Sequence, residues 1–588
     1  MMRVRHGTAA AALRQSRSMS GLPYRIRVPL AQLQERKSRP GEGVAATPTM
    51  ATLGDGEKLE TENTGPDYVR LALTSRVYDI VSETPLQYAS GLSARLGASV
   101  HLKREDLLPS FSFKLRGTYN QIAHLPGDTS SGVVTYSVGS QGHSSAIAAH
   151  HLGIGCTVVM PERTPLMRQH AIERTGAKVV VEGKSLGESQ EAAEKLAESS
   201  GARLLQPHND PLVIAGQATT GLEIIKQVGA ALEAEASLGP EQKLSAIFVV
   251  AGGSSLLAGI ASVFKSIMPH TKVIGVESSS ADLLHRSLLT GHRLSVPEPA
   301  HFVDGASVRQ LGDEVFRLCN ELVDDIVVVS DDEICAAVRD AFEDTRAVLE
   351  PAGALAIAGL KKYVDALPAP AGGGSKGHFV AISSDASNIE FDILRFIAER
   401  AAIGEQREKL FALRMPDRTG MFFDMYKAVQ PRLVTEFVYR HSPHHDDALV
   451  YMSMESAQTD SNKAFGEDVT SSLETLGVYA IDITGDELAK SHARHLAGGR
   501  PGEISGERVI RFEFPENAGA LMQFLASLRH DWFLTMLHYR NHGGQVGKVL
   551  AGIRVPEGED GAFTEMIEGL GYIYTEETEN LLYRDFMR

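Results

Sequence analysis

The chain has 588 residues, of which 43% are hydrophobic, enough for more than one domain with a large buried core. Its formal net charge of −16 argues against nucleic acid as a partner, because binding a phosphate backbone requires a basic surface. No run of about 18 apolar residues is present, which argues against a membrane-spanning segment, and the three cysteines lack the spacing of a metal site.

The N-terminal segment differs in composition from the rest of the chain. Six arginines, with alanine and serine between them, precede Glu35, which is the first acidic residue. This composition is typical of an organellar transit peptide, and the alternative is an ordinary disordered basic tail. We assign residues 1–50 to a transit peptide and disordered N-terminus, with mitochondrion and plastid both open as destinations. Residues 51–67 are predicted to be an unstructured linker.

Residues 68–402 alternate short apolar strands with amphipathic helices, the pattern of a parallel sheet covered on both faces. The predicted strands are 132–136, 156–160, 178–181, 246–250, 272–276 and 379–383. Ligands bind such sheets at the carboxyl ends of the strands. The loops that follow these strands are therefore the candidate site.

Lys114 is the first residue of a predicted helix, 114–123, which follows a short strand at 100–103 and a polar turn. An ammonium near the positive end of a helix dipole is disfavoured, and burial beside Phe111 and Phe113 would lower the lysine pKa further. The neutral amine is the form that makes a Schiff base with an aldehyde cofactor. Taken alone, the position also fits a solvated surface lysine.

The sequence around Lys114 resembles that of the biosynthetic threonine dehydratases, which belong to the second structural class of pyridoxal phosphate enzymes. The similar segments follow the family's order and extend over roughly residues 68–588, so chance resemblance is a weak alternative. These segments are 74–79, 83–86, 103–106, 112–117, 214–217 with Gly221 and Glu223, 312–319, 350–356 and 404–408.

The resemblance implies both a fold and a reaction. The fold is a two-lobed parallel-sheet catalytic domain at residues 68–402, similar to the tryptophan synthase β chain. The reaction is the dehydration and deamination of L-threonine to 2-oxobutanoate and ammonia, the first step of isoleucine synthesis, with L-serine as an alternative substrate. Lys114 would hold pyridoxal 5'-phosphate and then take the proton from the substrate Cα. The family also implies a homotetramer.

The loop after the strand at 246–250 is rich in glycine and leads into a helix, an arrangement that suits a phosphate. The family has four glycines here, and this chain has serine at the last two positions. Serine hydroxyls can donate to phosphate, but a left-handed backbone at either serine would be strained. From the resemblance, the cofactor-binding residues near the lysine and in this loop are Phe113, Lys114, Gly252, Gly253, Ser254, Ser255 and Leu256.

The loop after the strand at 132–136 reads Ser-Ala-Gly-Asn-His in the family, where its backbone binds the substrate carboxylate and its Asn touches the cofactor. This chain keeps Ser137 and Gly139 but has Ser140 and Gln141 where Asn and His are expected. The resemblance implies that these four residues bind substrate and that Ser140 also reaches the cofactor. His143 is a candidate base, although a histidine near a helix start is more often structural.

A third departure follows the strand at 379–383, where a serine of the family meets the pyridine nitrogen. Matching forward from the strand gives this role to Ser384, which we prefer, and matching backward from Phe391 gives it to Asp385. A neutral serine leaves the pyridine nitrogen largely unprotonated. A carboxylate would hold a pyridinium and strengthen the electron sink.

The last third of the chain contains an internal repeat. Residues 413–420 and 512–519 are similar, and each closes a predicted strand and opens a helix that leads to a second strand, at 435–440 and 535–540. Two such units about 100 residues apart indicate a duplicated domain.

The repeats resemble the paired α+β ACT-like regulatory domains of the same family, here at 408–482 and 507–588, with a joining segment at 483–506. The resemblance implies isoleucine as inhibitor and valine as activator. Adjacent strand residues point to opposite faces, so a purely structural role is an equal alternative for the candidate effector residues. These candidates are Tyr439, Arg440, Tyr539 and Arg540.

A second hypothesis from a different class is a non-catalytic homologue that senses amino acids or regulates an active partner. The three altered cofactor loops support it. Lys114 favours an active enzyme, because loss of this residue would be an easy route to inactivity and the chain has kept it.

Overall fold

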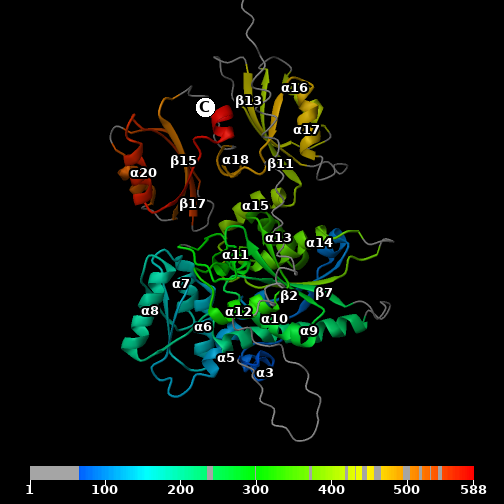
Figure 1. The fold of residues 1–588 in the computed structure, drawn as a ribbon, viewed down its shortest axis with the longest axis vertical. Coiled ribbons are helices and arrows are strands. Elements are labelled where there is room, and N and C mark those ends of the chain that lie inside the picture. Colours follow the sequence, from blue (N-terminus) through cyan, green and yellow to red (C-terminus); the bar gives the residue numbers. More distant parts are fainter. Residues whose placement is uncertain are drawn as a thin grey trace, which may run out of the picture. The chain divides into compact units, whose positions relative to one another are not determined.

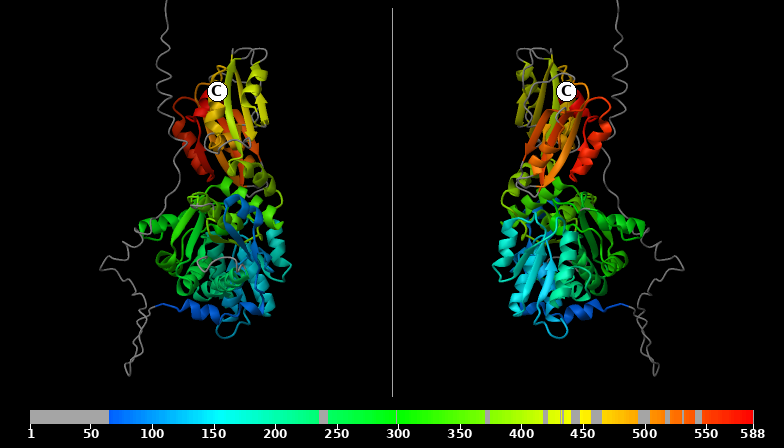
Figure 2. Two further views of the ribbon diagram at one scale, coloured as in Figure 1. Left: turned by 90° about the vertical axis from the view of Figure 1, so that its right-hand side faces the viewer. Right: turned by 90° about the vertical axis from the view of Figure 1, so that its left-hand side faces the viewer.

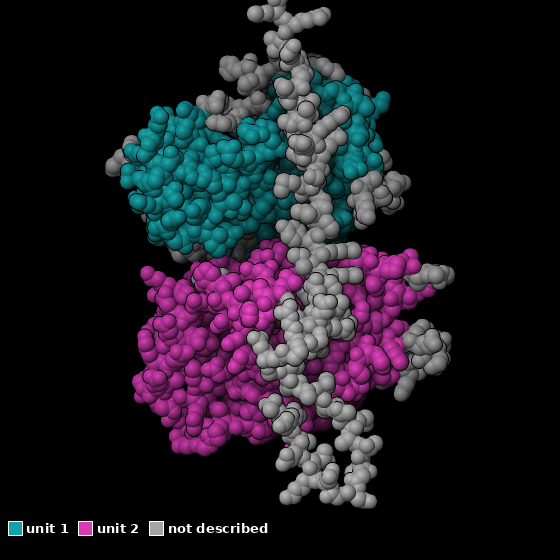
Figure 3. Space-filling model, in the orientation of Figure 1, with its two compact units in different colours: residues 1–26, 392–588 teal, residues 27–391 magenta. Residues whose placement is uncertain are grey.

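The computed structural model describes residues 65–587, except 235–242, 298, 370–373, 417–420, 431, 433, 440–446, 456–464, 494–503, 516–519, 530–531 and 541–545. The described residues fall into two compact units, 65–391 and 392–587, which Figure 3 colours separately. The predicted transit peptide and most of the predicted linker lie outside the described residues. The division after Phe391 comes earlier than the domain boundary expected at 402.

The first unit contains two sheets (Figure 1), which agrees with the two-lobed parallel-sheet domain that the family resemblance implied. The larger has the strand order β1-β2-β10-β7-β8-β9, and all neighbours are parallel except β1 and β2. Its strands are β1 Leu86–Tyr88, β2 Ser99–Arg104, β7 Leu244–Val250, β8 Lys272–Ser278, β9 Asp325–Val329 and β10 His378–Ser383.

The smaller sheet is parallel throughout and has the order β5-β4-β3-β6. Its strands are β3 Val133–Tyr136, β4 Cys156–Met160, β5 Lys178–Val181 and β6 Arg203–Leu204. Every strand predicted in this unit is confirmed to within two residues at each end. The prediction missed β1 and β6, which are too short to show a pattern, and β9.

Helices cover the sheets of the first unit. They are α3 Tyr68–Leu73, α4 Ser90–Leu96, α5 Lys114–Ala123, α6 Ser140–His151, α7 Leu166–Glu173, α8 Leu186–Ser200, α9 Pro211–Ala234, α10 Ser255–Ile267, α11 Leu283–Thr290, α12 Asp313–Leu322, α13 Asp331–Thr345 and α14 Pro351–Asp365. On β8, Gly275 faces Leu257 of α10 and Val276 faces Gly359 of α14. Adjacent strand residues point to opposite faces, so these two helices cover opposite faces of the large sheet.

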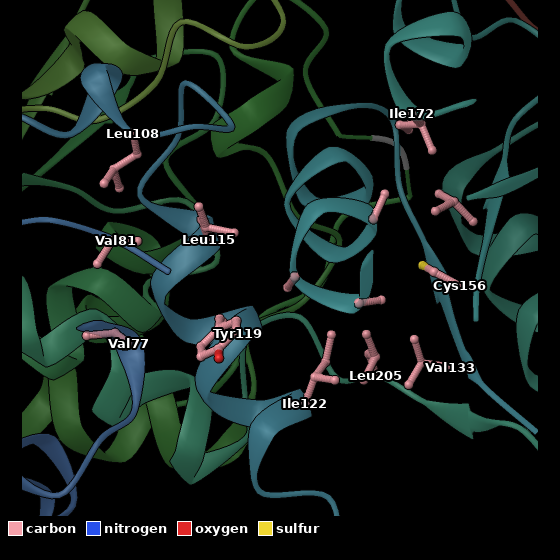
Figure 4. Packing of buried hydrophobic residues seen from close by; sticks show 14 of the residues in the cluster. Val77, Val81, Leu108, Leu115, Tyr119, Ile122, Val133, Cys156, Ile172 and Leu205 are labelled. Atoms are coloured by element: carbon pink, nitrogen blue, oxygen red, sulfur yellow. The ribbon is translucent and has the colours of Figure 1, made fainter. Parts of the chain in front are cut away.

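Helix α5 begins at Lys114 and ends at Ala123, as predicted. Its buried Leu115, Tyr119 and Ile122 belong to one apolar cluster with Val133 of β3 and Cys156 of β4 (Figure 4). The same cluster contains Ala146, Ala148 and Ala149 of α6, so α5 packs on α6, which in turn packs on the smaller sheet.

Arg116 holds the other side of α5 through a fully buried set of charges. Its guanidinium donates to Glu105, 2.7 Å away after β2, and to Glu223 of α9 at 2.6 Å. Lys103 of β2 also donates to Glu223, at 2.6 Å. Burial alone would raise the pKa of Glu223, but Arg116 and Lys103 lower it below its usual value.

The second unit contains the predicted duplication (Figure 2). Both repeats have the order strand-helix-strand-strand-helix-strand, and both sheets are antiparallel with corresponding strand orders, β12-β13-β11-β14 and β16-β17-β15-β18. The first repeat contains β11 Glu408–Pro416, α16 Met421–Val429, β12 Val434–Tyr439, β13 Asp447–Glu455, α17 Phe465–Glu474 and β14 Tyr479–Asp482. The second contains β15 Glu507–Pro515, α19 Ala520–Ser527, β16 Phe533–Arg540, β17 Val546–Arg554, α20 Asp560–Gly569 and β18 Ile573–Glu576.

No helix in the described part of the chain is both long and apolar enough to cross a membrane. The described residues likewise contain no group of three or more histidine, cysteine or acidic side chains that could hold a metal ion.

Replacing Arg116 by methionine should strongly destabilise the first unit. The change leaves Glu105 and Glu223 buried without their main cation, so we expect the free energy of unfolding to fall by about 3–5 kcal/mol. The control is Arg76→Met, which removes an exposed pair with Asp79 and should cost about 1 kcal/mol or less. Denaturant unfolding measures both variants, and equal losses would contradict the structural role of Arg116.

Candidate active site

The candidate site lies where loops from both sheets of the first unit meet around Lys114. The lysine is buried at the first position of α5, and its Nζ lies 3.0 Å from the Oγ of Ser140 and 3.2 Å from an Oδ of Asp385. Ser140 follows the carboxyl end of β3, and Asp385 follows that of β10. The cluster therefore lies at the carboxyl ends of the strands, where ligands bind to parallel sheets.

The loop after β10 turns Asp385 rather than Ser384 toward the lysine. The Asp385 carboxylate also accepts a hydrogen bond from Ser112. Burial raises the pKa of Asp385 above its usual value, and Lys114 and Ser112 act in the opposite direction. The Ser384 Oγ is buried and has no hydrogen-bond partner among the described residues. Both side chains are therefore available to a ligand, one as a carboxylate and the other as a hydroxyl.

The loop after β3 uses its predicted substrate-binding residues in different ways. The Ser137 Oγ accepts the backbone N–H groups of Gly139 and Gly142, both at 2.9 Å, and so shapes the loop itself. The Gln141 side chain donates to Thr118 of α5 at 3.0 Å. Ser140 is the member of this group that contacts Lys114.

Asn388 closes the site from the loop after β10. Its Nδ2 donates to the Ser140 Oγ at 3.5 Å, and its Oδ1 lies 2.0 Å from where a Cβ on Gly139 would be. No side chain fits at position 139. Sequence reasoning missed Asn388, which lies three residues after Asp385 in the same loop.

The glycine loop joins β7 to α10. Gly253 approaches His208 so closely that a Cβ would lie 2.4 Å from the imidazole Nδ1. Ser254 has a φ of 59°, so its backbone is in the left-handed region, which is strained for a serine. Its Oγ donates to the carbonyls of Ala251 and Gly252 at 3.0 and 3.1 Å, which steadies the turn. Ser255 and Leu256 begin α10, where the first N–H groups have no acceptor within the helix.

Glu350 is a second buried acid at the site. Its Oε2 accepts the backbone N–H of Asn388 at 2.7 Å, and its Oε1 has no partner among the described residues. Burial, followed by repulsion from Asp385, raises the pKa of Glu350 to about 8, so this side chain is mainly a neutral carboxylic acid at neutral pH. It opens one of the family-like segments, but sequence reasoning gave it no role.

Arg168 of α7 supports the same loop and was also missed. It donates to the carbonyl of Asn388 at 3.1 Å and to Asp304 at 2.5 Å. His143, the candidate base, is half-buried, and burial followed by the charge of Arg174 lowers its pKa.

The site fits an aldehyde cofactor that carries a phosphate. Buried polar atoms normally have partners, yet Ser384 Oγ, Asn388 Oδ1 and Glu350 Oε1 have none among the described residues. They lie in the same loop network as a buried lysine. A glycine turn that admits no side chain at Gly253 leads into the N-terminus of α10, which is suited to an anion.

Two known protein families match the sequence of this chain. Residues 77–380 match the family described as pyridoxal-phosphate dependent enzyme, and residues 399–493 and 498–587 match the C-terminal regulatory domain of threonine dehydratase. The fold and site are thus those of a pyridoxal-phosphate-dependent enzyme with a regulatory region. The chain belongs to the threonine dehydratase family.

Individual threonine dehydratases are similar in sequence to this protein over most of its length. The mitochondrial threonine dehydratase of Saccharomyces cerevisiae is 45% identical over 540 residues, which cover 90% of this chain and 91% of the relative. The chloroplastic biosynthetic threonine dehydratase 1 of Solanum lycopersicum is 39% identical, covering 96% of this chain and 89% of the relative. The solved structure of processed threonine deaminase isoform 2 from Solanum lycopersicum is 38% identical, with a TM-score of 0.52, and covers 57% of this chain and 88% of that one.

The candidate effector residues fall at the ends of corresponding strands. Tyr439 ends β12, and Tyr539 and Arg540 end β16, but nothing is described of their side chains. Arg440 lies outside the described residues. Their role in effector binding stays a prediction.

A shared apolar cluster joins the two regulatory repeats within the second unit. It contains Ala412 of β11, Val509 of β15 and Leu550 of β17, together with Leu488 of the joining segment. The C-terminal segment completes it, because Phe586 stacks on Tyr479 of β14 at 6.3 Å between ring centroids. The two sheets therefore form one packed unit.

The buried acid Glu350 should make stability depend on pH. Its pKa is about 8 in the folded protein and near 4.5 when unfolded, so the folded state keeps a proton that the unfolded state loses. Its contribution is present at low pH and is lost as pH rises toward 8. We expect the cofactor-free wild type to lose melting temperature relative to Glu350→Gln across this range. If melting temperature depends on pH in the same way for both proteins, Glu350 does not hold a proton in the folded state.

Proposed function

We propose that this chain dehydrates and deaminates L-threonine to 2-oxobutanoate and ammonia, and that Lys114 bears its pyridoxal 5'-phosphate. The observation that carries the proposal is the buried Lys114 amine, held at the meeting point of the loops by Ser140 and Asp385. The names of the relatives support threonine as substrate.

The residues that would hold the cofactor lie on four loops. Gly252, Gly253 and the start of α10 suit the phosphate, Phe113 lies beside the lysine, and Ser140 reaches the lysine amine. Ser384 or Asp385 would meet the pyridine nitrogen. When bound, pyridoxal phosphate supplies an electron sink for the electron pair of the Cα–H bond.

Lys114 is the residue proposed to move the proton that the reaction requires. Its amine takes the proton from Cα as a base, while the loop of Ser137 and Gly139 binds the substrate carboxylate. Loss of the β-hydroxyl as water leaves 2-aminobut-2-enoate. Water then replaces the nitrogen of its imine form, which gives 2-oxobutanoate and ammonia. L-serine, with the same β-hydroxyl, is the alternative substrate.

A non-catalytic amino-acid-sensing homologue is the second candidate function. The observation that favours it is the strained backbone of Ser254 in the loop proposed for the phosphate. The site around Lys114 argues for catalysis, because the buried amine contacts Ser140 and Asp385 from two loops at the carboxyl ends of the strands, where ligands bind parallel sheets.

The second unit is the proposed site of regulation. We infer that isoleucine inhibits and valine activates by binding to the paired repeats, and that the enzyme assembles as a homotetramer. An organellar location is supported by the basic composition of residues 1–34 and by relatives named mitochondrial and chloroplastic.

Replacing Lys114 by alanine should abolish the visible absorbance of bound cofactor and reduce turnover of threonine by at least about a thousandfold, because the reaction loses its base and its covalent attachment. Lys226→Ala, which removes an exposed lysine paired with Glu83, is the matched control and should be unchanged. The measurement is 2-oxobutanoate release together with an absorption spectrum. Near-normal turnover by Lys114→Ala would refute the assignment.

Isoleucine should raise the melting temperature of the full chain, because a ligand that binds the folded state stabilises it. The experiment uses Lys114→Ala, so that any shift reports on regulation and not on turnover, with D-isoleucine as the control. A shift of several degrees at millimolar L-isoleucine is expected. If an active wild type and this variant both show no shift, isoleucine is not the effector.

A further inference from the structure

His208 lies in the loop after β6, and the proposed mechanism gives it no role. Its imidazole packs directly on the glycine loop, since a Cβ on Gly253 would lie 2.4 Å from Nδ1 and 2.6 Å from both Cε1 and Cγ. The contact joins a loop of the smaller sheet to a loop of the larger one. The ring thus borders the turn that is proposed for the cofactor phosphate.

The neighbours of His208 fix the loop on three sides. The carbonyl of Gln206 accepts a hydrogen bond from Gln121 of α5 at 3.3 Å. The Asn209 Oδ1 caps α12 by accepting the N–H of Glu314 at 3.0 Å, and the Asp210 Oδ1 accepts the N–H of Leu212 in α9 at 2.7 Å. The loop therefore has little freedom to move.

In contrast to these neighbours, the imidazole of His208 has no hydrogen-bond partner among the described residues. A polar ring on a fixed loop, left without a protein partner, is available to a ligand. Burial, followed by the positive charge of Lys114, lowers the pKa of His208 to about 4. The ring is thus neutral at neutral pH and carries one N–H donor.

An anionic oxygen is the ligand atom that best suits this donor. Hydrogen bonds to an ionised acceptor are stronger than those between neutral groups, and a phosphate at the glycine loop would lie next to the ring. Carboxylates would repel the same phosphate, and a hydrocarbon ring could not donate to it.

We propose that His208 donates a hydrogen bond to the phosphate group of pyridoxal phosphate at the glycine loop, as a binding residue specific to the phosphate. The inference rests on the proposed function, from which it takes the location of the phosphate. It adds a side-chain donor to a turn in which the hydroxyl of Ser254 is directed to backbone carbonyls.

The test compares two probes on the cofactor-free protein, pyridoxal 5'-phosphate and pyridoxal, which lacks the phosphate. Equilibrium dialysis with His208→Phe should show affinity for pyridoxal phosphate weakened by about tenfold or more, as expected for a lost bond to a charged group, with affinity for pyridoxal unchanged. His208→Gln keeps an N–H donor and should recover much of the loss. His285→Gln, which alters a histidine of α11 that is not part of the site, is the matched control and should bind both probes normally.

Three outcomes would overturn the inference. Equal weakening of both probes would mean that the ring only packs, and no weakening would mean that it does not bind the phosphate. A raised KM for threonine with normal affinity for pyridoxal phosphate would assign the ring to the substrate. In all three cases the wild type still binds the cofactor through Lys114, whereas a wild type that binds neither probe would refute the proposed function itself.

Discussion

The position of the site depends on the buried charges that surround Arg116. Two cations, Lys103 and Arg116, face two carboxylates, Glu105 and Glu223. Arg116 belongs to α5 itself, and the other three residues come from neighbouring elements. Buried ion pairs of this kind add little net stability but tolerate few alternative arrangements, because any unpaired member is costly. They fix the start of α5, and with it the backbone of Lys114 two residues earlier. The apolar cluster on the opposite side of the helix completes the restraint.

The altered loops change the partners of the lysine without removing its polar surroundings. Ser140 stands where the family has asparagine, and Asn388 approaches it from another loop. The backbone N–H of Glu350 donates to the carbonyl of Asp385. The Glu350 carboxyl group holds a proton, and the Asp385 carboxyl group faces the Lys114 amine. This arrangement suits a site that must hold a positively charged or hydrogen-bonding ring nitrogen. The altered loops thus still surround the lysine with side chains that can hydrogen-bond.

The sequence predicted the scaffold more completely than the site. Helix α5 and the strands before the key loops were predicted because their hydrophobic patterns are local, and the two regulatory repeats were predicted because one pattern occurs twice. Residues such as Glu350, Asn388, Arg168 and His208 were missed because their roles arise from contacts between segments far apart in the chain. The sequence match favoured Ser384 over Asp385, but the turn after β10, which the sequence does not show, brings Asp385 to the lysine. The strain at Ser254 was anticipated because glycine alone adopts such a backbone freely.

The most direct test of the account locates the cofactor on the chain. The purified protein, loaded with pyridoxal phosphate, is reduced with borohydride and digested, and mass spectrometry identifies the lysine that carries the phosphopyridoxyl group. We expect the label on Lys114. A label on another lysine, such as the buried Lys103, or no label in a protein that converts threonine to 2-oxobutanoate, would contradict it.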